Sequence, residues 1–167
     1  MLKLLKAWMG GAKAEAAPAA EPAPALPTTV EAEGVAPLTL ANVWVPDAPV
    51  PLVAWEGVHR WLEGLPDEAA RATAWAACER AWLAHLCLAL GPDYRLRAQG
   101  EVLLVSSLAP NAAETLLSFV NRTRERILRV LDGVAAAPAW GHDILLVFDD
   151  DETYYRYVAH YYPEAGE

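Results

Sequence analysis

The stretch DILLVFDDDETYYRYVAHYY, residues 143–162, decides the fold that the sequence predicts. Residues 144–148 form an unbroken apolar run of branched and aromatic side chains, which is typical of a strand covered on both faces. Four acidic residues follow, and the next segment places apolar side chains at the i, i+3, i+4 and i+7 spacing of a helix. These apolar positions are Tyr154, Tyr157, Val158 and Tyr161. The stretch therefore predicts a buried strand, an acidic turn and a helix that lies on the strand.

Two helices are expected earlier in the chain. Apolar side chains recur at helical spacing over residues 55–65 and again over 66–90, where Asp67 lies in the first turn and Gly91 ends the pattern. The apolar faces of these helices carry three tryptophans, Trp61, Trp75 and Trp82. They could line an aromatic ligand pocket, but large apolar residues at helical spacing are more often part of a core.

A hairpin and a third helix are expected between those helices and the stretch at residues 143–162. Residues 93–107 alternate around a Gln99-Gly100 turn, which predicts two strands of which the second is the more buried. Residues 111–131 have helical spacing, and Asn111 with Glu114 has the spacing of a capping box. The expected core stripe of this helix is Leu116, Val120, Ile127, Leu131 and Val134.

The predicted fold class is α+β, with amphipathic helices packed on a small sheet of about three strands, a hairpin plus one buried strand. A chain of 167 residues with 54% hydrophobic residues suits one domain with its own core. We assign this domain to residues 38–167 and expect it to be the front part of a larger domain, because nothing predicted here pairs with the second edge of the strand at 144–148.

The chain before residue 38 is expected to lie outside that domain. Residues 14–37 are dominated by alanine, proline and glutamate, which predicts a disordered linker. Residues 1–13 form a short amphipathic segment that carries lysines and no acidic residue. Weak contact with a membrane surface is conceivable through its apolar side chains Leu2, Leu5, Trp8 and Met9. No segment approaches the ~20 apolar residues that span a bilayer.

The charge and the cysteines limit the classes of partner and compartment. A net charge of −9 argues against binding to nucleic acid, which requires clustered lysine and arginine. Cys78 and Cys87 are separated by about 13.5 Å along one predicted helix, too far for a disulfide. Two unpaired cysteines suit a reducing compartment, so the predicted location is cytoplasmic, with peripheral membrane contact as an option.

One pattern in the acidic turn indicates chemistry. Residues 144–153 fit the hhhhDxDxT signature of haloacid-dehalogenase-like phosphotransferases, which would make Asp149 a nucleophile and Asp151 an acid/base, both near Mg²⁺. These two residues are the only candidate metal ligands. The alternative is that Asp150 or Asp151 caps the helix that follows. The chain has no HExxH, no P-loop and no GxSxG, so the sequence predicts no catalytic residue, no zinc site and no cofactor.

Three segments carry a resemblance to a known group of proteins. They are WLEGLP at 61–66, EVLLVSSL at 101–108 and ILLVFDDDETYYRYVAHYYPEAGE at 144–167. With these segments the chain resembles the region that precedes the catalytic helix in uncharacterised bacterial proteins similar to peptidase-MA-like zinc metallopeptidases of the gluzincin kind. The resemblance implies the order hairpin, helix, strand, helix, followed in a longer version by an edge strand and a Zn²⁺-binding HExxH helix. No ligand of that zinc is carried over to this chain.

Two hypotheses of function remain open, with a third more remote. The first is a non-catalytic front portion of a metallopeptidase-like protein, which would leave one strand edge unpaired and prone to binding a protein partner or a second copy. The second is a complete interaction module whose surface is rich in tryptophan, tyrosine and acidic residues; it requires Tyr155 and Tyr162 to be exposed together with Trp61 or Trp82. The third is a fragment of a DxDxT phosphotransferase.

Overall fold

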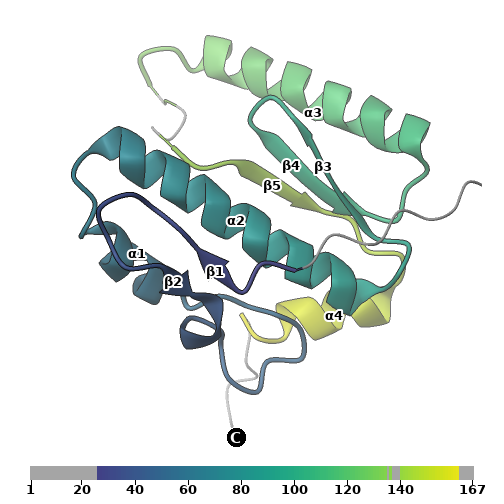
Figure 1. Ribbon diagram of the computed structural model, residues 1–167. Helices are drawn as coiled ribbons and strands as arrows, with labels where there is room; N and C mark the ends of the chain where they lie inside the picture. Colours follow the sequence, from purple (N-terminus) through teal and green to yellow (C-terminus); the bar gives the residue numbers. More distant parts are fainter. Residues whose placement is uncertain (1–25, 135, 137–139, 162–167) are drawn as a thin grey trace, which may run out of the picture.

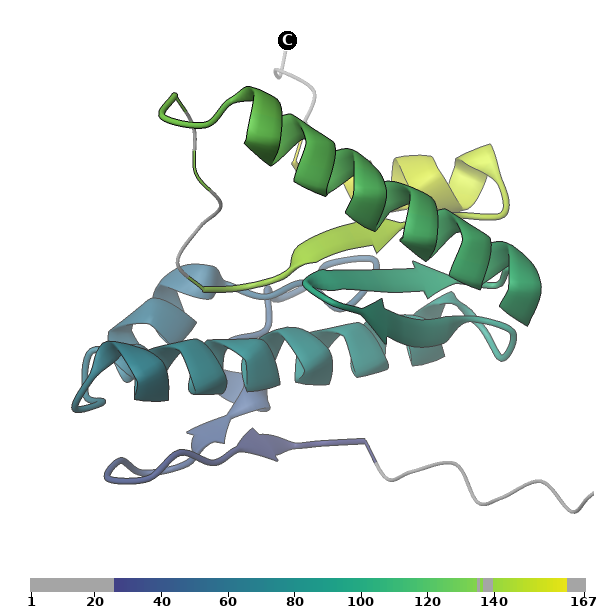
Figure 2. The same cartoon turned by 90° about the horizontal axis from the view of Figure 1, so that it is seen from above.

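A three-stranded sheet lies between two long helices in the computed structural model, which describes residues 26–134, 136 and 140–161 (Figures 1 and 2). This arrangement confirms the predicted α+β class. The elements in chain order are β1 (Thr29–Val30), β2 (Leu38–Thr39), a 3₁₀ turn (Leu40–Asn42), α1 (Trp55–Leu62), α2 (Glu68–Leu90), β3 (Arg95–Gln99), β4 (Val102–Ser106), α3 (Pro110–Val130), β5 (Asp143–Leu146) and α4 (Asp151–Val158).

Strand β4 is the centre of the sheet, whose order is β3-β4-β5. It pairs antiparallel with β3 and parallel with β5, and all five of its residues are buried. Its side chains alternate between two cores. Leu103 and Val105 pack with residues of α2 such as Leu83, whereas Leu104 packs with Leu117 of α3. The period of two in the sequence thus places one helix on each face of the sheet.

The prediction of a buried strand at residues 144–148 is wrong in one respect. β5 spans Asp143–Leu146 and its apolar side chains are only half-buried, although its place at an edge of the sheet agrees with the unpaired edge expected for this strand. An apolar run is typical of a strand with both faces covered, but it does not show whether both edges are paired. The central position belongs to β4.

Helix α2 begins and ends where its sequence signals predict. The Asp67 carboxylate accepts a hydrogen bond from the Ala70 N–H at 2.8 Å, which satisfies a free donor of the first turn. The helix ends before Gly91, which has a φ of +139° that other residues rarely adopt.

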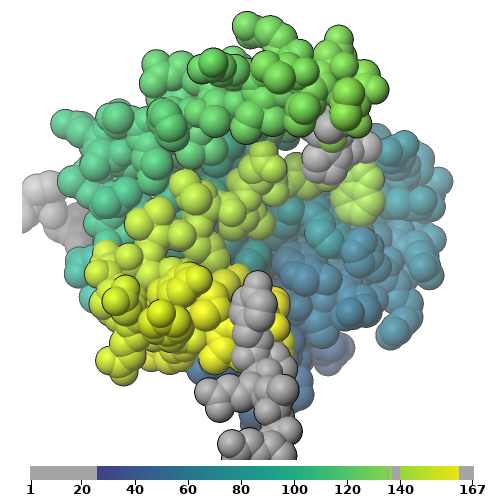
Figure 3. Space-filling view, turned by 180° about the vertical axis from the view of Figure 1, so that it is seen from behind, coloured from purple at the N-terminus to yellow at the C-terminus, as the bar shows by residue number. Residues whose placement is uncertain are grey.

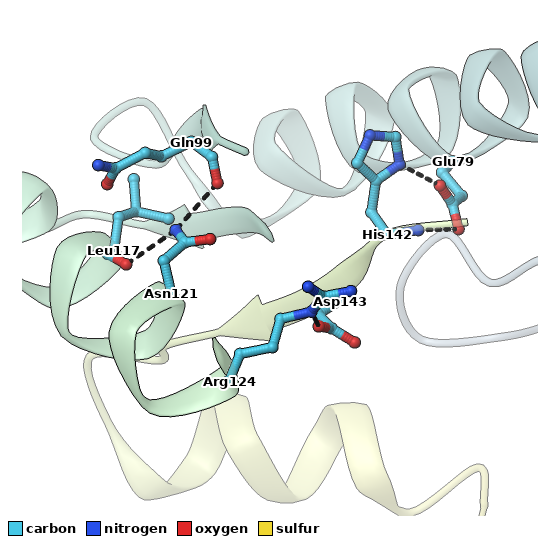
Figure 4. Close-up of polar contacts among 7 residues, drawn as sticks. All are labelled: Glu79, Gln99, Leu117, Asn121, Arg124, His142 and Asp143. Carbon is cyan, nitrogen blue, oxygen red and sulfur yellow. Dashed lines mark hydrogen bonds and ion pairs between the residues drawn. The ribbon is translucent and has the colours of Figure 1, made fainter. Parts of the chain in front are cut away.

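Helix α3 begins one residue earlier than predicted and without the predicted capping box. Its N-cap is Ala109, and Pro110 occupies the first helical position. Because the fixed φ of proline suits that position, Asn111 lies inside the helix and its side chain does not cap. Asn121 ties the helix to the hairpin, since its Nδ2 donates to the Gln99 carbonyl at 3.0 Å (Figure 4).

The predicted core stripe of α3 is exposed over its second half. The two buried residues of this helix, Ala113 and Leu117, belong to its first half. Ile127, Leu131 and Val134 are 51%, 37% and 83% exposed. The helical period identifies an apolar face, but the three strands of the sheet do not extend far enough to cover all of it.

Part of the expected linker is ordered. Strand β1 lies within the expected linker at residues 14–37 and pairs with β2, and the Val30 side chain is 5% exposed in the core under α2. The indole N–H of Trp61 donates to the Ala36 carbonyl at 2.8 Å. The folded region therefore starts before residue 38. The amphipathic segment 1–13, the linker residues up to 25 and residues 162–167 lie outside the described residues.

Helix α4 only partly follows its predicted stripe. Tyr157 and Val158 are half-buried, and Tyr157 packs with the α2 side of the sheet, but Tyr154 and Tyr161 are 46% and 52% exposed. Within the described ranges, no helix has the length and apolar character needed to cross a bilayer.

Candidate functional site

The acidic turn between β5 and α4 is organised as a helix cap. The Asp150 carboxylate accepts from the Thr153 N–H at 2.7 Å and from the Thr153 hydroxyl at 3.0 Å, which confirms the capping alternative. These hydrogen bonds, the one from the backbone N–H first, lower the pKa of Asp150.

Asp149 and Asp151, the two candidate metal ligands of this turn, have no third metal-ligating side chain beside them among the described residues. The hydroxyl of Ser107, at the end of β4, donates to the Asp149 carboxylate, and the Asp149 N–H donates to the Tyr94 hydroxyl at 3.0 Å. Asp151 is exposed in the first turn of α4. Across the described part of the chain, no three histidine, cysteine, aspartate or glutamate side chains are grouped as metal ligands.

The most buried carboxylate among the described residues is one that no sequence pattern indicated. Glu79 of α2 is 3% exposed, and both of its oxygens are bound (Figure 4). Its Oε1 accepts from the Trp75 indole N–H at 2.6 Å and from the His142 backbone N–H at 3.2 Å, and its Oε2 lies 2.6 Å from His142 Nδ1. Gly141 has a φ of +96°, and a Cβ there would lie 3.3 Å from Glu79 Oε1. This network fixes the chain immediately before β5 against α2.

Tryptophans pack around this network rather than around a ligand cavity. The Trp75 ring lies 4.7 Å from that of Trp55 and 5.2 Å from that of Trp140. Trp82 is 5% exposed, and its indole N–H donates to the Pro51 carbonyl at 2.8 Å. The three tryptophans named from the sequence therefore belong to the cores, as the core interpretation predicts.

The tyrosine and tryptophan surface of the interaction-module hypothesis is only partly present. Tyr155 is 65% exposed, but Trp82 is buried and Trp61 is half-buried. Tyr162 lies outside the described residues.

Cys78 and Cys87 are free and buried on α2. Burial, and next the negative charge of Glu79, raise the pKa of the Cys78 thiol from 9.0 to about 11. Burial also raises the pKa of Cys87. Only the thiolate attacks disulfide reagents, so both thiols should be inert in the folded protein.

At mildly alkaline pH, the urea-unfolded protein should react with two equivalents of Ellman's reagent. Over the same time, we expect neither thiol of the native protein to react. Because the Cys78 pKa is raised on folding, its contribution to stability is complete below pH 9.0 and is lost as the pH approaches about 11. Fast stoichiometric labelling of the native protein would contradict this prediction.

The open edge of β5 is the feature with the clearest capacity to bind something. The Asp143 N–H donates to the carbonyl of Glu101, just before β4, at 2.9 Å, and the Val147 N–H donates to the carbonyl of Val105 in β4 at 3.0 Å. Since backbone groups alternate along a strand, those of Ile144 and Leu146 point away from β4. No described strand pairs with them. Figure 3 shows this segment at the surface between α3 and α4.

An apolar hollow adjoins the start of this edge. It has a volume of about 400 Å³ and is lined by α3 residues that include Phe119, Val120 and Ile127, and by Asp143 of β5. Phe119 and Ile127 are 59% and 51% exposed. We call the outward edge of β5 together with Phe119, Ile127 and Val130 the β5–α3 surface.

Charged side chains lie at both ends of the β5–α3 surface. At the start of β5, Arg124 Nε forms an ion pair with Asp143 Oδ2 at 2.6 Å (Figure 4). The second half of α3 also carries Arg122, Arg126 and Arg129 together with Glu125, and Asp132 follows the helix. At the other end of β5, residues 149–152 are all acidic. The start of β5 therefore carries charges of both signs, whereas the turn that follows its end is acidic.

Comparison with known proteins adds no family to this description. No protein-family model, no curated protein sequence and no solved structure matches the chain. The resemblance to peptidase-MA-like proteins stays a prediction.

Proposed function

We propose that this domain is a non-catalytic interaction module that binds one further β-strand along the β5–α3 surface. The observation that carries the proposal is the edge of β5, which pairs with no strand of the described residues, beside the exposed apolar residues of α3. Exposed strand edges present free hydrogen-bond donors and acceptors, and proteins usually shield them with charges, bulges or short strands. β5 is a short edge strand of four residues, and an apolar hollow accompanies it, which is how strand-adding peptides gain both hydrogen bonds and side-chain pockets.

The place of such a module in a larger protein is also a proposal. The order β3, β4, α3, β5 and α4 is the order of hairpin, helix, strand and helix that the peptidase-MA-like resemblance implies. In a longer protein of that kind, the edge strand before the HExxH helix would bind beside β5. Any Zn²⁺ would then be held by that further part and not by this chain. The free cysteines support a reducing, cytoplasmic location.

A second candidate surface is carried by α4. Its tyrosines Tyr154, Tyr155 and Tyr161 are 46%, 65% and 52% exposed beside the acidic turn. Exposed tyrosines next to carboxylates suit a basic protein segment. Burial of Trp82 removes the other half of the surface that the sequence suggested, so we place this candidate second.

A displayed library of random octapeptides selected on the immobilised chain tests the strand-binding proposal. We expect the enriched peptides to alternate apolar and polar residues, because one face of an added strand meets the hollow and the other meets solvent. Ile127→Glu should abolish their binding by placing a charge in the hollow. The matched control is Leu88→Glu, because Leu88 is 66% exposed on α2, away from the surface. Peptides without alternation, or binding indifferent to Ile127→Glu, would refute the proposal.

A further inference from the structure

We infer that the proline-rich residues 22–26 of this chain bind, in polyproline II conformation, in an apolar groove beside α2. The groove has a volume of about 310 Å³ and is lined by residues of the loop 44–51 and by His85 of α2. Its apolar lining includes Trp44 and Pro49, and we call it the Trp44 groove. No residue of the β5–α3 surface lines it, so this inference concerns a second site and does not depend on the proposed function.

The loop that forms the Trp44 groove is held in place by its own contacts. At its base, the Val45 N–H donates to the Leu52 carbonyl at 2.8 Å. The rings of Trp44 and His85 meet edge to face, with 5.1 Å between their centroids. The hydrogen bond from the Trp82 indole also ties the loop to α2. The groove is therefore preformed, which lowers the entropic cost of binding a segment in it.

The first described residues of the chain already contact the lining of the groove. His85 Nε2 lies 2.7 Å from the Pro27 carbonyl oxygen, and because a carbonyl only accepts, the imidazole N–H is the donor. Leu26 and Pro27 are half-buried. The backbone carbonyls of a polyproline II helix have no partners within the helix, so they are free to accept such bonds. The contact at Pro27 is thus the first of a series that the residues before it continue.

The residues before Thr28 have the spacing of a polyproline ligand. Residues 24–27 are PALP, which is a PxxP pattern. A polyproline II helix has about three residues per turn, so Pro24 and Pro27 lie on the same side of it. With Pro27 held at His85, Pro24 is directed to the side on which the groove lies. Aromatic-lined grooves bind PxxP segments in this way, because the polyproline helix is preformed and loses little entropy on binding.

Charge and length set the limits of the bound segment. Residues 22–26 carry no charge, and Asp47 is the only acidic residue of the groove lining. Glu21 comes next toward the N-terminus, and repulsion between like charges keeps it away from Asp47. At about 3.1 Å per residue, residues 22–26 extend about 15 Å from Pro27, which is long enough to cross the groove.

Nuclear magnetic resonance spectra of the ¹⁵N-labelled full chain test the inference through the indole N–H signal of Trp44, which Trp44→Phe identifies. Replacing Pro22 and Pro24 together by glycine removes the preformed helix, so we expect this signal to shift. Adding a blocked peptide of the sequence PAPAL should return the signal of the double variant toward its wild-type position. The wild-type chain should need about tenfold more peptide for any response, because its own segment competes at a high effective concentration.

Three single variants serve as controls for the double variant. Pro18→Gly, outside the bound segment, should leave the Trp44 signal in place. Pro49→Glu, at an exposed position of the groove, should abolish the response to the peptide. Val130→Glu should not, because Val130 is 74% exposed on α3.

Two outcomes would contradict the inference. If the peptide shifts the Trp44 signal equally in the wild-type chain and in the double variant, the groove binds a proline-rich segment of another protein, and residues 22–26 are not its occupant. If the Trp44 signal responds neither to the proline replacements nor to the peptide, the groove is not a binding site for such segments.

Discussion

Replacement of Glu79 by alanine is expected to lower the free energy of unfolding by about 2–5 kcal/mol, because it leaves two buried hydrogen-bond donors without their acceptor. The Glu79 carboxylate accepts hydrogen bonds from the Trp75 indole and the His142 backbone, and its second oxygen lies 2.6 Å from the His142 ring. Without it, the Trp75 and His142 donors lose their acceptor in a nearly closed site. Urea unfolding followed by tryptophan fluorescence measures the loss.

Two further variants serve as controls for Glu79→Ala. Glu79→Gln keeps an acceptor for Trp75 and should cost less than alanine. Glu114→Ala, at an exposed position of α3, should change the free energy of unfolding by less than about 0.5 kcal/mol. If Glu79→Ala matched the effect of Glu114→Ala, the network would be no more than a surface contact, and the anchoring of the chain before β5 would need another cause.

Elements whose boundaries depend on neighbouring residues could be predicted from the sequence. The Asp67 side chain caps the start of α2, and the backbone of Gly91 ends it. Gly100, with a φ of +57°, allows the hairpin turn. Asp150 caps α4 three residues before Thr153. These signals act within a few residues, so no tertiary information is needed to recognise them.

Features that depend on distant parts of the chain could not be predicted. The apolar period of α3 gives the direction of Ile127 but not whether any element covers it, and the apolar run of β5 does not reveal that its side chains are only half-buried. Val30 is buried only because α2 passes over it, so its surroundings in the sequence resemble a linker. Glu79 and His142 are 63 positions apart, so their contact could not be predicted. The one signal in the sequence was that Glu79 lies between Cys78 and Trp82, on the apolar face of its helix.

The candidate site combines both kinds of feature. The acidic turn and the arginines of α3 are visible in the sequence as two runs of charge. That they mark opposite ends of one strand follows only from the Arg124–Asp143 contact, which joins positions 19 apart.

The second large effect is expected from Leu104→Ala, which should lower the free energy of unfolding by about 2–5 kcal/mol. Leu104 lies on the central strand, is 0% exposed and packs beneath α3 with Ala113 and Leu117. Truncation leaves a cavity between the sheet and the one half of α3 that is buried, so α3 should be held less firmly over β5. Leu103 faces α2 instead. Leu103→Ala should therefore lower the free energy of unfolding by a similar amount but leave the β5–α3 surface in place.

Comparison of these two variants with the control Leu88→Ala separates stability from function. Chemical unfolding should show a large loss of unfolding free energy for Leu104→Ala and Leu103→Ala. The loss for Leu88→Ala should be near zero, since Leu88 is 66% exposed. Under conditions where all three remain folded, peptide binding should weaken for Leu104→Ala more than for Leu103→Ala, because only Leu104 supports the helix that carries Phe119 and Ile127. Equal binding by the two variants would mean that α3 is positioned without its packing on β4, and that the hollow depends on the Asn121 and Arg124 contacts alone.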